Sequence, residues 1–95
     1  SMALEKHPTH EAEIRRLNRI SGQVEGVKKM IEEQRYCPEI LTQLRATRSA
    51  VRGIEAEILR RHLSSCVITA MQSGDEASRA RSIDEVTRLF SKFDE

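Results

Sequence analysis

Apolar residues recur between residues 11 and 34 at the spacing of an amphipathic α-helix. Successive members of the stripe are three, four or seven residues apart, which follows the helical repeat. The stripe consists of Ile14, Leu17, Val24, Val27 and Ile31, with Ile20 and Met30 beside it. His7-Pro8-Thr9 is a suitable start, because proline fits the first turn of a helix. The pattern predicts a first helix from this tripeptide to about Gln34.

A second helical pattern follows Tyr36-Cys37-Pro38. This tripeptide interrupts the first helix, because the residue before a proline avoids the α conformation, while Pro38 can itself open a new helix. The apolar seam that follows has steps of four and three residues, as in a coiled coil, and only Thr47 interrupts it. Its members are Ile40, Leu44, Thr47, Val51, Ile54 and Ile58. We expect this helix to reach about Met71 and to end at Ser73-Gly74.

A third and shorter helix is predicted near the C-terminus. Ser82-Ile83-Asp84-Glu85 has the pattern of a capping box, in which the first and last side chains satisfy N–H groups at the start of a helix. The apolar side of this helix is formed by Ile83, Val86, Phe90 and Phe93. The three patterns predict an all-α fold, with residues 1–95 as one helical domain and residues 1–8 as a flexible arm.

The length of the second helix predicts an oligomer. A helix of about 33 residues is about 50 Å long at ~1.5 Å per residue. One companion helix of about 26 residues and one short helix cannot cover its seam on both sides. An isolated chain would therefore expose an apolar stripe, which monomers rarely do. The simplest solution is a dimer that forms an antiparallel four-helix bundle.

Composition narrows the class of protein. Apolar residues make up 38% of the chain and charged residues 33%, which is too apolar for a disordered protein. No apolar run approaches the ~18 residues of a membrane span, and no secretory signal is recognisable, so we expect a cytoplasmic protein. Its two cysteines are then expected to be reduced thiols, available for metal or redox chemistry. The sequence contains no Gly-rich phosphate loop and no nucleophile elbow, which argues against an enzyme.

His62 and Cys66 are the first candidates for a site. They are four residues apart, so they share one face of the predicted second helix. Taken alone, the pair also fits a packed cysteine beside a hydrogen-bonded histidine. Cys37 lies about 38 Å from His62 along a helix, at ~1.5 Å per residue, so one protomer cannot bring the three together.

An antiparallel dimer would place the start of one second helix beside the end of the other. Two equivalent sites would then form across the interface, each with two cysteine sulfurs and one imidazole nitrogen. A trigonal set of this kind suits Cu(I), which prefers soft ligands. Zn(II) usually takes a fourth ligand to complete a tetrahedron.

Several segments resemble the CsoR/RcnR/FrmR family of small all-helical bacterial repressors, and the resemblance extends from about Arg15 to Phe93. Its most specific part is Cys37 followed by His62-x3-Cys66, which is similar to the copper-sensing CsoR branch. The segments are Arg19-Ile20-Ser21-Gly22-Gln23-Val24-Glu25-Gly26, Tyr36-Cys37, Leu44-Arg45-Ala46-Thr47-Arg48-Ser49-Ala50-Val51 and His62-Leu63-Ser64-Ser65-Cys66.

The resemblance implies a Cu(I)-responsive transcriptional repressor. In such a protein Cys37 of one protomer would bind Cu(I) together with His62 and Cys66 of the other. Tyr36 and Glu85 would adjoin these ligands and orient the imidazole. The resemblance also implies a dimer of dimers that binds double-stranded operator DNA without metal and releases it when Cu(I) binds. Because Glu85 is also part of the predicted capping box, the sequence assigns it two competing roles.

Other branches of this family leave alternatives open. Nickel and cobalt sensors have an additional histidine at the position of Glu5, and this chain has His7 and His10 close by. Formaldehyde sensors lack the second cysteine, so Cys66 argues against that branch. Persulfide sensors keep both cysteines and lack the histidine, so a dithiol that responds to sulfide species remains an alternative. A copper carrier that does not bind DNA is a further one.

Arginines gather on the first two predicted helices. Residues 11–62 carry eleven Lys and Arg against eight Asp and Glu, although the net charge of the whole chain is only +1. Oligomerisation would multiply these charges into a broad positive surface for DNA, and the sequence has no helix-turn-helix or zinc-finger spacing. The candidate DNA-binding residues are Arg15, Arg16, Arg19, Arg45, Arg48 and Arg52. The alternative is a solvated face on which they pair with Glu11, Glu13, Glu55 and Glu57.

Overall fold

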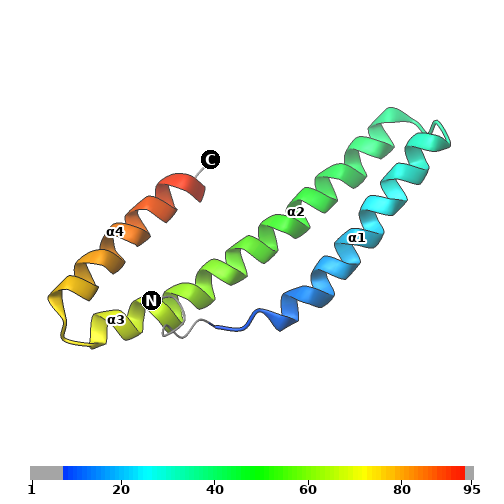
Figure 1. The fold of residues 1–95 in the computed structure, drawn as a ribbon. Helices are drawn as coiled ribbons and strands as arrows, with labels where there is room; N and C mark the ends of the chain where they lie inside the picture. The colour runs from blue at the N-terminus through cyan, green and yellow to red at the C-terminus, as the bar shows by residue number, and fades with distance from the viewer. Residues whose placement is uncertain (1–7, 94–95) are drawn as a thin grey trace. The chain divides into compact units, whose positions relative to one another are not determined.

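The computed structural model describes residues 8–93, and this part of the chain consists of helices and short turns, without strands (Figure 1). The elements are α1 (Glu11–Glu32), α2 (Cys37–His62), the π-helical segment η2 (Leu63–Val67), α3 (Ile68–Gln72) and α4 (Glu76–Phe93). The predicted all-α fold is confirmed. Most of the arm predicted over residues 1–8, with Glu5 and His7, lies outside the described residues. Within residues 8–93, no helix combines the length and the apolar character that a membrane crossing requires.

Residues 10–58 form a helical hairpin, in which α1 runs antiparallel to the first part of α2 (Figure 1). A Schellman motif ends α1 and turns the chain. In this motif Gln34 adopts a left-handed φ of 55°. Its N–H donates to the carbonyl of Ile31 (3.0 Å), and the N–H of Arg35 donates to that of Met30 (2.9 Å). The first helix therefore ends close to the predicted position.

The hairpin buries a different row of α1 from the one predicted. Ile20 and Val27 are buried, and Met30 continues their row as a half-buried residue. Of the predicted stripe only Val27 belongs to this row. The other members are largely exposed, namely Ile14, Leu17, Val24 and Ile31. The row that the hairpin covers therefore lies beside the apolar stripe of the sequence, because within the hairpin only the row that faces α2 is covered.

The predicted seam of α2 divides in a similar way. Three of its members, spaced by one heptad, are buried or half-buried, namely Ile40, Thr47 and Ile54. Thr47 is compatible with this row because its hydroxyl donates to the carbonyl of Gln43 (2.9 Å). The remaining members are exposed together with a further leucine, and this second row comprises Leu41, Leu44, Val51 and Ile58. The hairpin thus leaves one apolar row of α2 uncovered.

The second predicted helix changes its hydrogen-bond pattern near its end. The backbone stays helical from Cys37 to Gln72, close to the predicted limits. Residues 63–67, however, form η2, in which the N–H of Ile68 donates to the carbonyl of Leu63 across five residues. Single π-helical turns inside α-helices occur frequently at functional sites. Apolar periodicity gives no sign of such a turn.

The last helix, α4, begins well before the predicted start. Asp75 caps it, because its carboxylate accepts hydrogen bonds from the N–H of Ala77 (3.1 Å) and from the hydroxyl of Ser78 (2.8 Å). The predicted capping box at Ser82–Glu85 is therefore wrong, since these residues lie inside α4 and the serine is buried. This placement leaves the carboxylate of Glu85 available for another contact.

In the unit that contains residues 59–93, α4 packs against η2 and α3. Gly74, with a φ of 80°, turns the chain from α3 toward α4. Val86, which the sequence placed on the apolar side of the last helix, is half-buried. Ile83 and Phe90, placed on the same side, are 55% and 63% exposed, so this unit also has an uncovered apolar face. The side chain of Phe93 lies outside the described part.

We expect Asp75→Ala to loosen the first turn of α4. The hydroxyl of Ser78 and the N–H of Ala77 donate to the carboxylate and lower the pKa of Asp75 below its ordinary value of 3.8. A group with a lowered pKa stabilises the fold above its unfolded-state pKa, and this effect is lost as the pH falls through its folded-state pKa. The protection of the Ala77 and Ser78 amides from hydrogen exchange should therefore be lower in the variant at neutral pH.

The same measurement in acid provides the pH test. Below pH 3.8 the protection in wild type should fall toward that of the Asp75→Ala variant, because the carboxylate becomes protonated. Asp84→Ala removes a carboxylate further along α4, which pairs with Arg88, and should leave the amides of the first turn unchanged. Equal protection in wild type and Asp75→Ala at neutral pH would refute the capping role.

Candidate metal centre

Cys37 and Tyr36 lie at the start of α2. Cys37 is the first residue of the helix, and its thiol is free and exposed. Tyr36 precedes the helix and is 71% exposed. Its carbonyl accepts hydrogen bonds from the N–H groups of Glu39 (3.0 Å) and Ile40 (3.3 Å), which fixes the turn into α2. Both side chains are therefore presented at the surface of the hairpin.

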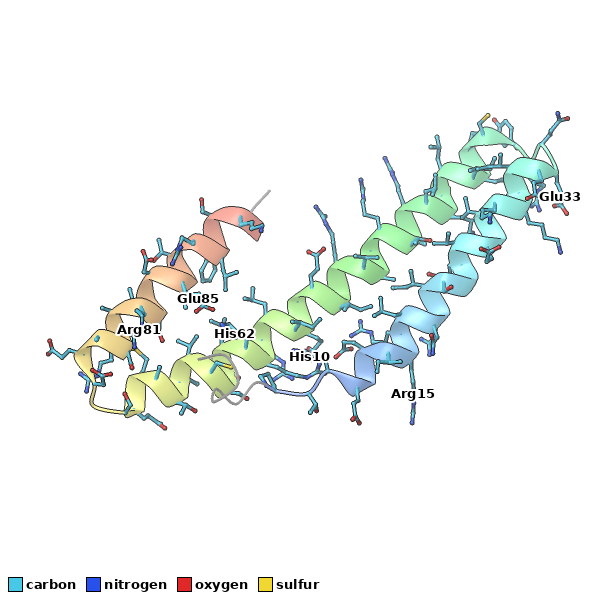
Figure 2. All side chains as sticks on the ribbon, in the orientation of Figure 1. His10, Arg15, Glu33, His62, Arg81 and Glu85 are labelled. Atoms are coloured by element: carbon cyan, nitrogen blue, oxygen red, sulfur yellow. The ribbon has the colours of Figure 1, made fainter. Side chains whose placement is uncertain are left out.

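His62 is the last residue of α2, and it contacts Glu85 on α4 (Figure 2). The contacting atoms are His62 Nε2 and Glu85 Oε1. Because an ionised carboxylate only accepts hydrogen bonds, Nε2 carries the hydrogen, and Nδ1 of a neutral imidazole keeps its lone pair. The His62 side chain is 24% exposed. The structure thus brings together two of the residues that the sequence singled out.

Cys66 lies in η2, four residues after His62. It forms no disulfide within residues 8–93, and its side chain is half-buried. Because η2 is π-helical, the rotation between His62 and Cys66 differs from that of a regular α-helix. The two residues nevertheless remain within one helical turn of each other, since a π-helix bonds residues that are five apart.

Within residues 8–93 of one chain, no three His, Cys, Asp or Glu residues lie close enough together to hold a metal ion. Cys37 and His62 are the first and the last residue of α2. A site that combines Cys37, His62 and Cys66 therefore requires a second chain.

The candidate DNA-binding arginines are mostly exposed. This is true of Arg15, Arg19, Arg45, Arg48 and Arg52. Within the described residues, no ion pair joins any of these five to a carboxylate, so the structure does not contain the pairing with Glu11, Glu13, Glu55 and Glu57 that the solvated-face alternative assumed for them. Figure 2 shows Arg15 extending from α1 on the side away from α2. These five guanidinium groups are thus available to an anionic partner.

Arg16 is the exception among the six. Its Nη1 lies 3.2 Å from Oε2 of Glu13, and the two side chains are 40% and 3% exposed. The guanidinium also lies against α2, because a Cβ atom added at Gly53 would be 2.8 Å from Nη2 of Arg16. An ion pair between Arg16 and Glu13 was expected for a solvated face, but the glutamate of this pair is buried.

The burial of Glu13 was not predicted from the sequence. A glutamate in the first turn of a helix ordinarily indicates an exposed position that favours the helix dipole. The one sign of this burial in the sequence is the position of Glu13 in the helical repeat. It lies one heptad before Ile20 and two heptads before Val27, and both of these residues are buried.

These features define a class of protein. Residues 8–93 are helical, carry two cysteines that form no disulfide and an imidazole held by a carboxylate, and expose a set of arginines. Residues 9–92 match the model of a family described as metal-sensitive transcriptional repressor. The chain therefore belongs to this family of metal-sensing transcriptional repressors, which are regulators and not enzymes.

Relatives within the family include two copper-sensing repressors and the repressor RcnR. The chain is 40% identical to the copper-sensing repressor CsoR of Bacillus subtilis, over 82% of this chain and 74% of that protein. It is 47% identical to the copper-sensing repressor RicR of Mycobacterium tuberculosis, over 63% of this chain and 62% of that protein. It is also 33% identical to the repressor RcnR of Escherichia coli K12, over 82% of this chain and 83% of that protein.

Two solved structures resemble the fold. The copper-sensing repressor CsoR with Cu(I) from Geobacillus thermodenitrificans matches with a TM-score of 0.81 and 36% identity, over 96% of both chains. The nickel-responsive regulator InrS matches with a TM-score of 0.73 and 31% identity, over 92% of this chain and 98% of that one. The comparisons thus define a metal sensor, and the choice of metal depends on the ligands.

Proposed function

We propose that this protein is a Cu(I)-responsive repressor that binds operator DNA without metal and releases it when Cu(I) binds. The donor set carries this proposal, because it offers the sulfurs of Cys37 and Cys66, neither of which is in a disulfide, and the imidazole of His62. Soft thiolate ligands favour Cu(I), and three ligands leave tetrahedral Zn(II) incomplete. The similarity to two copper-sensing repressors and to a CsoR structure with Cu(I) supports the same metal.

The residues present fit such a metal. Cys37 of one protomer would bind it together with His62 and Cys66 of its partner. Because Glu85 occupies Nε2 of His62, Nδ1 is the nitrogen left for the metal, and the contact fixes the orientation of the ring. Tyr36, exposed beside Cys37, would adjoin the ligands from the other side. Bound Cu(I) would supply coordinate bonds that link the two chains of the proposed dimer.

The shared site requires a dimer, and two hairpins could form one by packing their uncovered apolar rows against each other. These rows are Ile14, Leu17, Val24 and Ile31 on α1, and Leu41, Leu44, Val51 and Ile58 on α2. Two hairpins that pair antiparallel through them would form a four-helix bundle, and each α2 would begin beside the end of its partner. The exposed Ile83 and Phe90 of α4 offer a second apolar face, on which two dimers would form a tetramer.

DNA would be bound by the exposed arginines of this assembly. Arg45, Arg48 and Arg52 follow one another along α2, and Arg15 and Arg19 lie one turn apart on α1. Symmetry repeats both groups in every protomer, so that the assembly carries an extended positive surface. Contacts from such arginines to phosphates supply affinity and position the protein on the duplex.

The response to metal follows from which elements the ligands join. Cys37 lies at the start of α2, whereas His62 and Cys66 lie where α2 passes into η2. Joining these ends across the dimer would favour one arrangement of the two α2 helices, and we propose that this arrangement binds DNA less tightly. By linkage, DNA must then weaken Cu(I) binding by the same factor.

The test is DNA binding with and without metal. Duplexes that bind the apo protein are selected from a random-sequence pool, and their affinity is measured under anaerobic conditions with and without Cu(I). We expect the affinity to fall by about 5- to 150-fold, the usual range of coupling between two sites. A protein that binds Cu(I) but selects no DNA would be a carrier, and unchanged DNA affinity with Cu(I) bound would refute copper sensing.

Nickel or cobalt sensing is the second candidate, because the chain is also similar to RcnR and InrS. His10 is half-buried at the start of α1 and offers an additional nitrogen. The same binding assay with Ni(II) in place of Cu(I) separates the two. Release by Ni(II) and not by Cu(I) would favour this candidate.

A further inference from the structure

The buried carboxylate of Glu13 has no part in the proposed metal response. Its side chain is only 3% exposed, at the end of the buried row of α1. A charged group in such a place is costly unless a cation pairs with it. Arg16, one turn further along α1, donates to it from Nη1 over 3.2 Å. Glu13 therefore depends on Arg16 for part of its compensation.

Gly53 determines where the Arg16 guanidinium can lie. A Cβ atom at this position of α2 would be 2.8 Å from Nη2 of Arg16, which is closer than Cβ atoms approach such groups. Only glycine leaves this space on α2. The guanidinium is thus held between Glu13 on its own helix and Gly53 on the neighbouring one.

Arg16 differs in this respect from the other arginines of the proposed DNA surface. Within residues 8–93, Arg15 and Arg19 on the same helix have no carboxylate partner, and Arg45, Arg48 and Arg52 on α2 have none either. An arginine that is already bound to a buried carboxylate can bind a phosphate only by leaving it or by sharing its donors.

We propose that Glu13 withholds Arg16 from DNA and thereby limits the number of phosphate contacts that each protomer makes. This inference rests on the proposed DNA-binding function. Glu13 and a DNA phosphate compete for one guanidinium. The carboxylate prevails in wild type, because the departure of Arg16 would remove a partner from a buried charge that water cannot solvate.

Two variants release Arg16 by independent routes. Glu13→Gln keeps the shape of the side chain and removes its charge. Gly53→Ala leaves Glu13 intact and displaces the flexible end of Arg16, and it also replaces glycine by a better helix former. Both variants should therefore present Arg16 to DNA.

The measurement is the salt dependence of binding between the apo protein and the duplex selected above. Each new phosphate contact should steepen the slope of log affinity against log salt by about 0.9. The ratio of affinities at 50 and 200 mM salt should then rise about threefold for each protomer whose Arg16 reaches a phosphate. Arg48→Ala, which removes an arginine without a carboxylate partner, calibrates the loss of one contact.

Controls separate this effect from a general change of charge. Glu25→Gln removes the same charge from an exposed pair with Lys28 (3.4 Å) on α1, and we expect an unchanged slope. Adding Arg16→Ala to either releasing variant should abolish the gain. If circular dichroism shows that Glu13→Gln does not fold, Gly53→Ala alone decides.

Three results would overturn the inference. The first is a slope of log affinity against log salt that is the same in the folded Glu13→Gln and Gly53→Ala variants as in wild type. The second is a shallower slope in these variants. The third is a steeper slope that persists when Arg16→Ala is added. A wild-type protein that selects no DNA at all would instead reject the proposed function, and this inference with it.

Discussion

The His62→Ala variant is expected to bind DNA as the wild type does and to lose most of its release by Cu(I). The arginines of the proposed DNA surface are unaffected, so the affinity of the apo protein should be preserved. Cys37 and Cys66 remain, and two thiolates suffice to bind some Cu(I). The imidazole, however, is the ligand that contacts Glu85 on α4, so its removal disconnects the metal from that helix. The ratio of DNA affinities without and with Cu(I) should fall from the expected range of about 5 to 150 to near one.

The matched control for this variant is His10→Ala. His10 lies at the start of α1 and has no place among the three proposed copper ligands, so a copper sensor should keep its full response without it. Full release of DNA by Cu(I) from His62→Ala would refute the assignment of the imidazole. A wild type that releases DNA with polysulfide and not with Cu(I) would favour the dithiol alternative, in which Cys37 and Cys66 exchange sulfur without a metal.

Mixing two inactive variants is expected to restore copper binding if the site is shared between chains. Cys37→Ala and Cys66→Ala each remove one ligand from both sites of a dimer. A mixed dimer contains one site with Cys37 from one chain and His62 with Cys66 from the other, and one site with neither cysteine. Random pairing makes about half of the dimers mixed, so about a quarter of the wild-type number of three-ligand sites should return.

The control mixture combines Cys66→Ala with a double variant that carries both His62→Ala and Cys66→Ala. Every site in this mixture lacks the sulfur of Cys66, so pairing the two chains restores neither a three-ligand site nor a site with two thiolates. Sites are counted by anaerobic Cu(I) titration against a competing chelator after joint refolding, which allows the chains to exchange. Equal titrations for the two mixtures would mean that Cys37, His62 and Cys66 do not form a site between chains.

Three continuous helical stretches could be predicted from the sequence, because proline and a glycine-containing turn mark their ends, whereas the π-helical segment η2 within the second stretch could not. The start of α4 could not be predicted in the same way. Ser82 and Glu85 imitate a capping box, whereas the true cap is Asp75, which precedes the apolar pattern of the helix. A cap depends on local hydrogen bonds, and two suitable sequences within one segment cannot be distinguished by pattern alone.

The buried rows were harder to predict than the helices. In α1 the apolar residues occupy two adjacent heptad rows, and periodicity alone does not say which row meets the other helix of the same chain. Val24 and Val27 illustrate this, because both belong to the predicted stripe and only Val27 is buried. The exposed row is apolar as well, which is expected if a second chain covers it.

The spacing of Cys37, His62 and Cys66 along the chain predicted the proposed metal ligands. The resemblance to the family predicted that Glu85 adjoins His62. Spacing could not provide that contact, because it depends on where α4 begins and how it folds back onto η2. The pairing of Arg16 with Glu13 was equally inaccessible. An acidic residue in a first turn is common at the surface, so the sequence position of Glu13 did not indicate that its side chain is only 3% exposed.

The space at Gly53 has a consequence for protein engineering. A glycine inside an α-helix lowers stability by about 1 kcal/mol relative to alanine, and a buried carboxylate is another conventional target for improvement. Both occur where α1 meets α2, and both contact the Arg16 side chain. A biosensor built on this scaffold and selected only for heat resistance would therefore tend to acquire substitutions at Gly53 or Glu13. Its detection threshold would shift as a result, although no metal ligand had been altered.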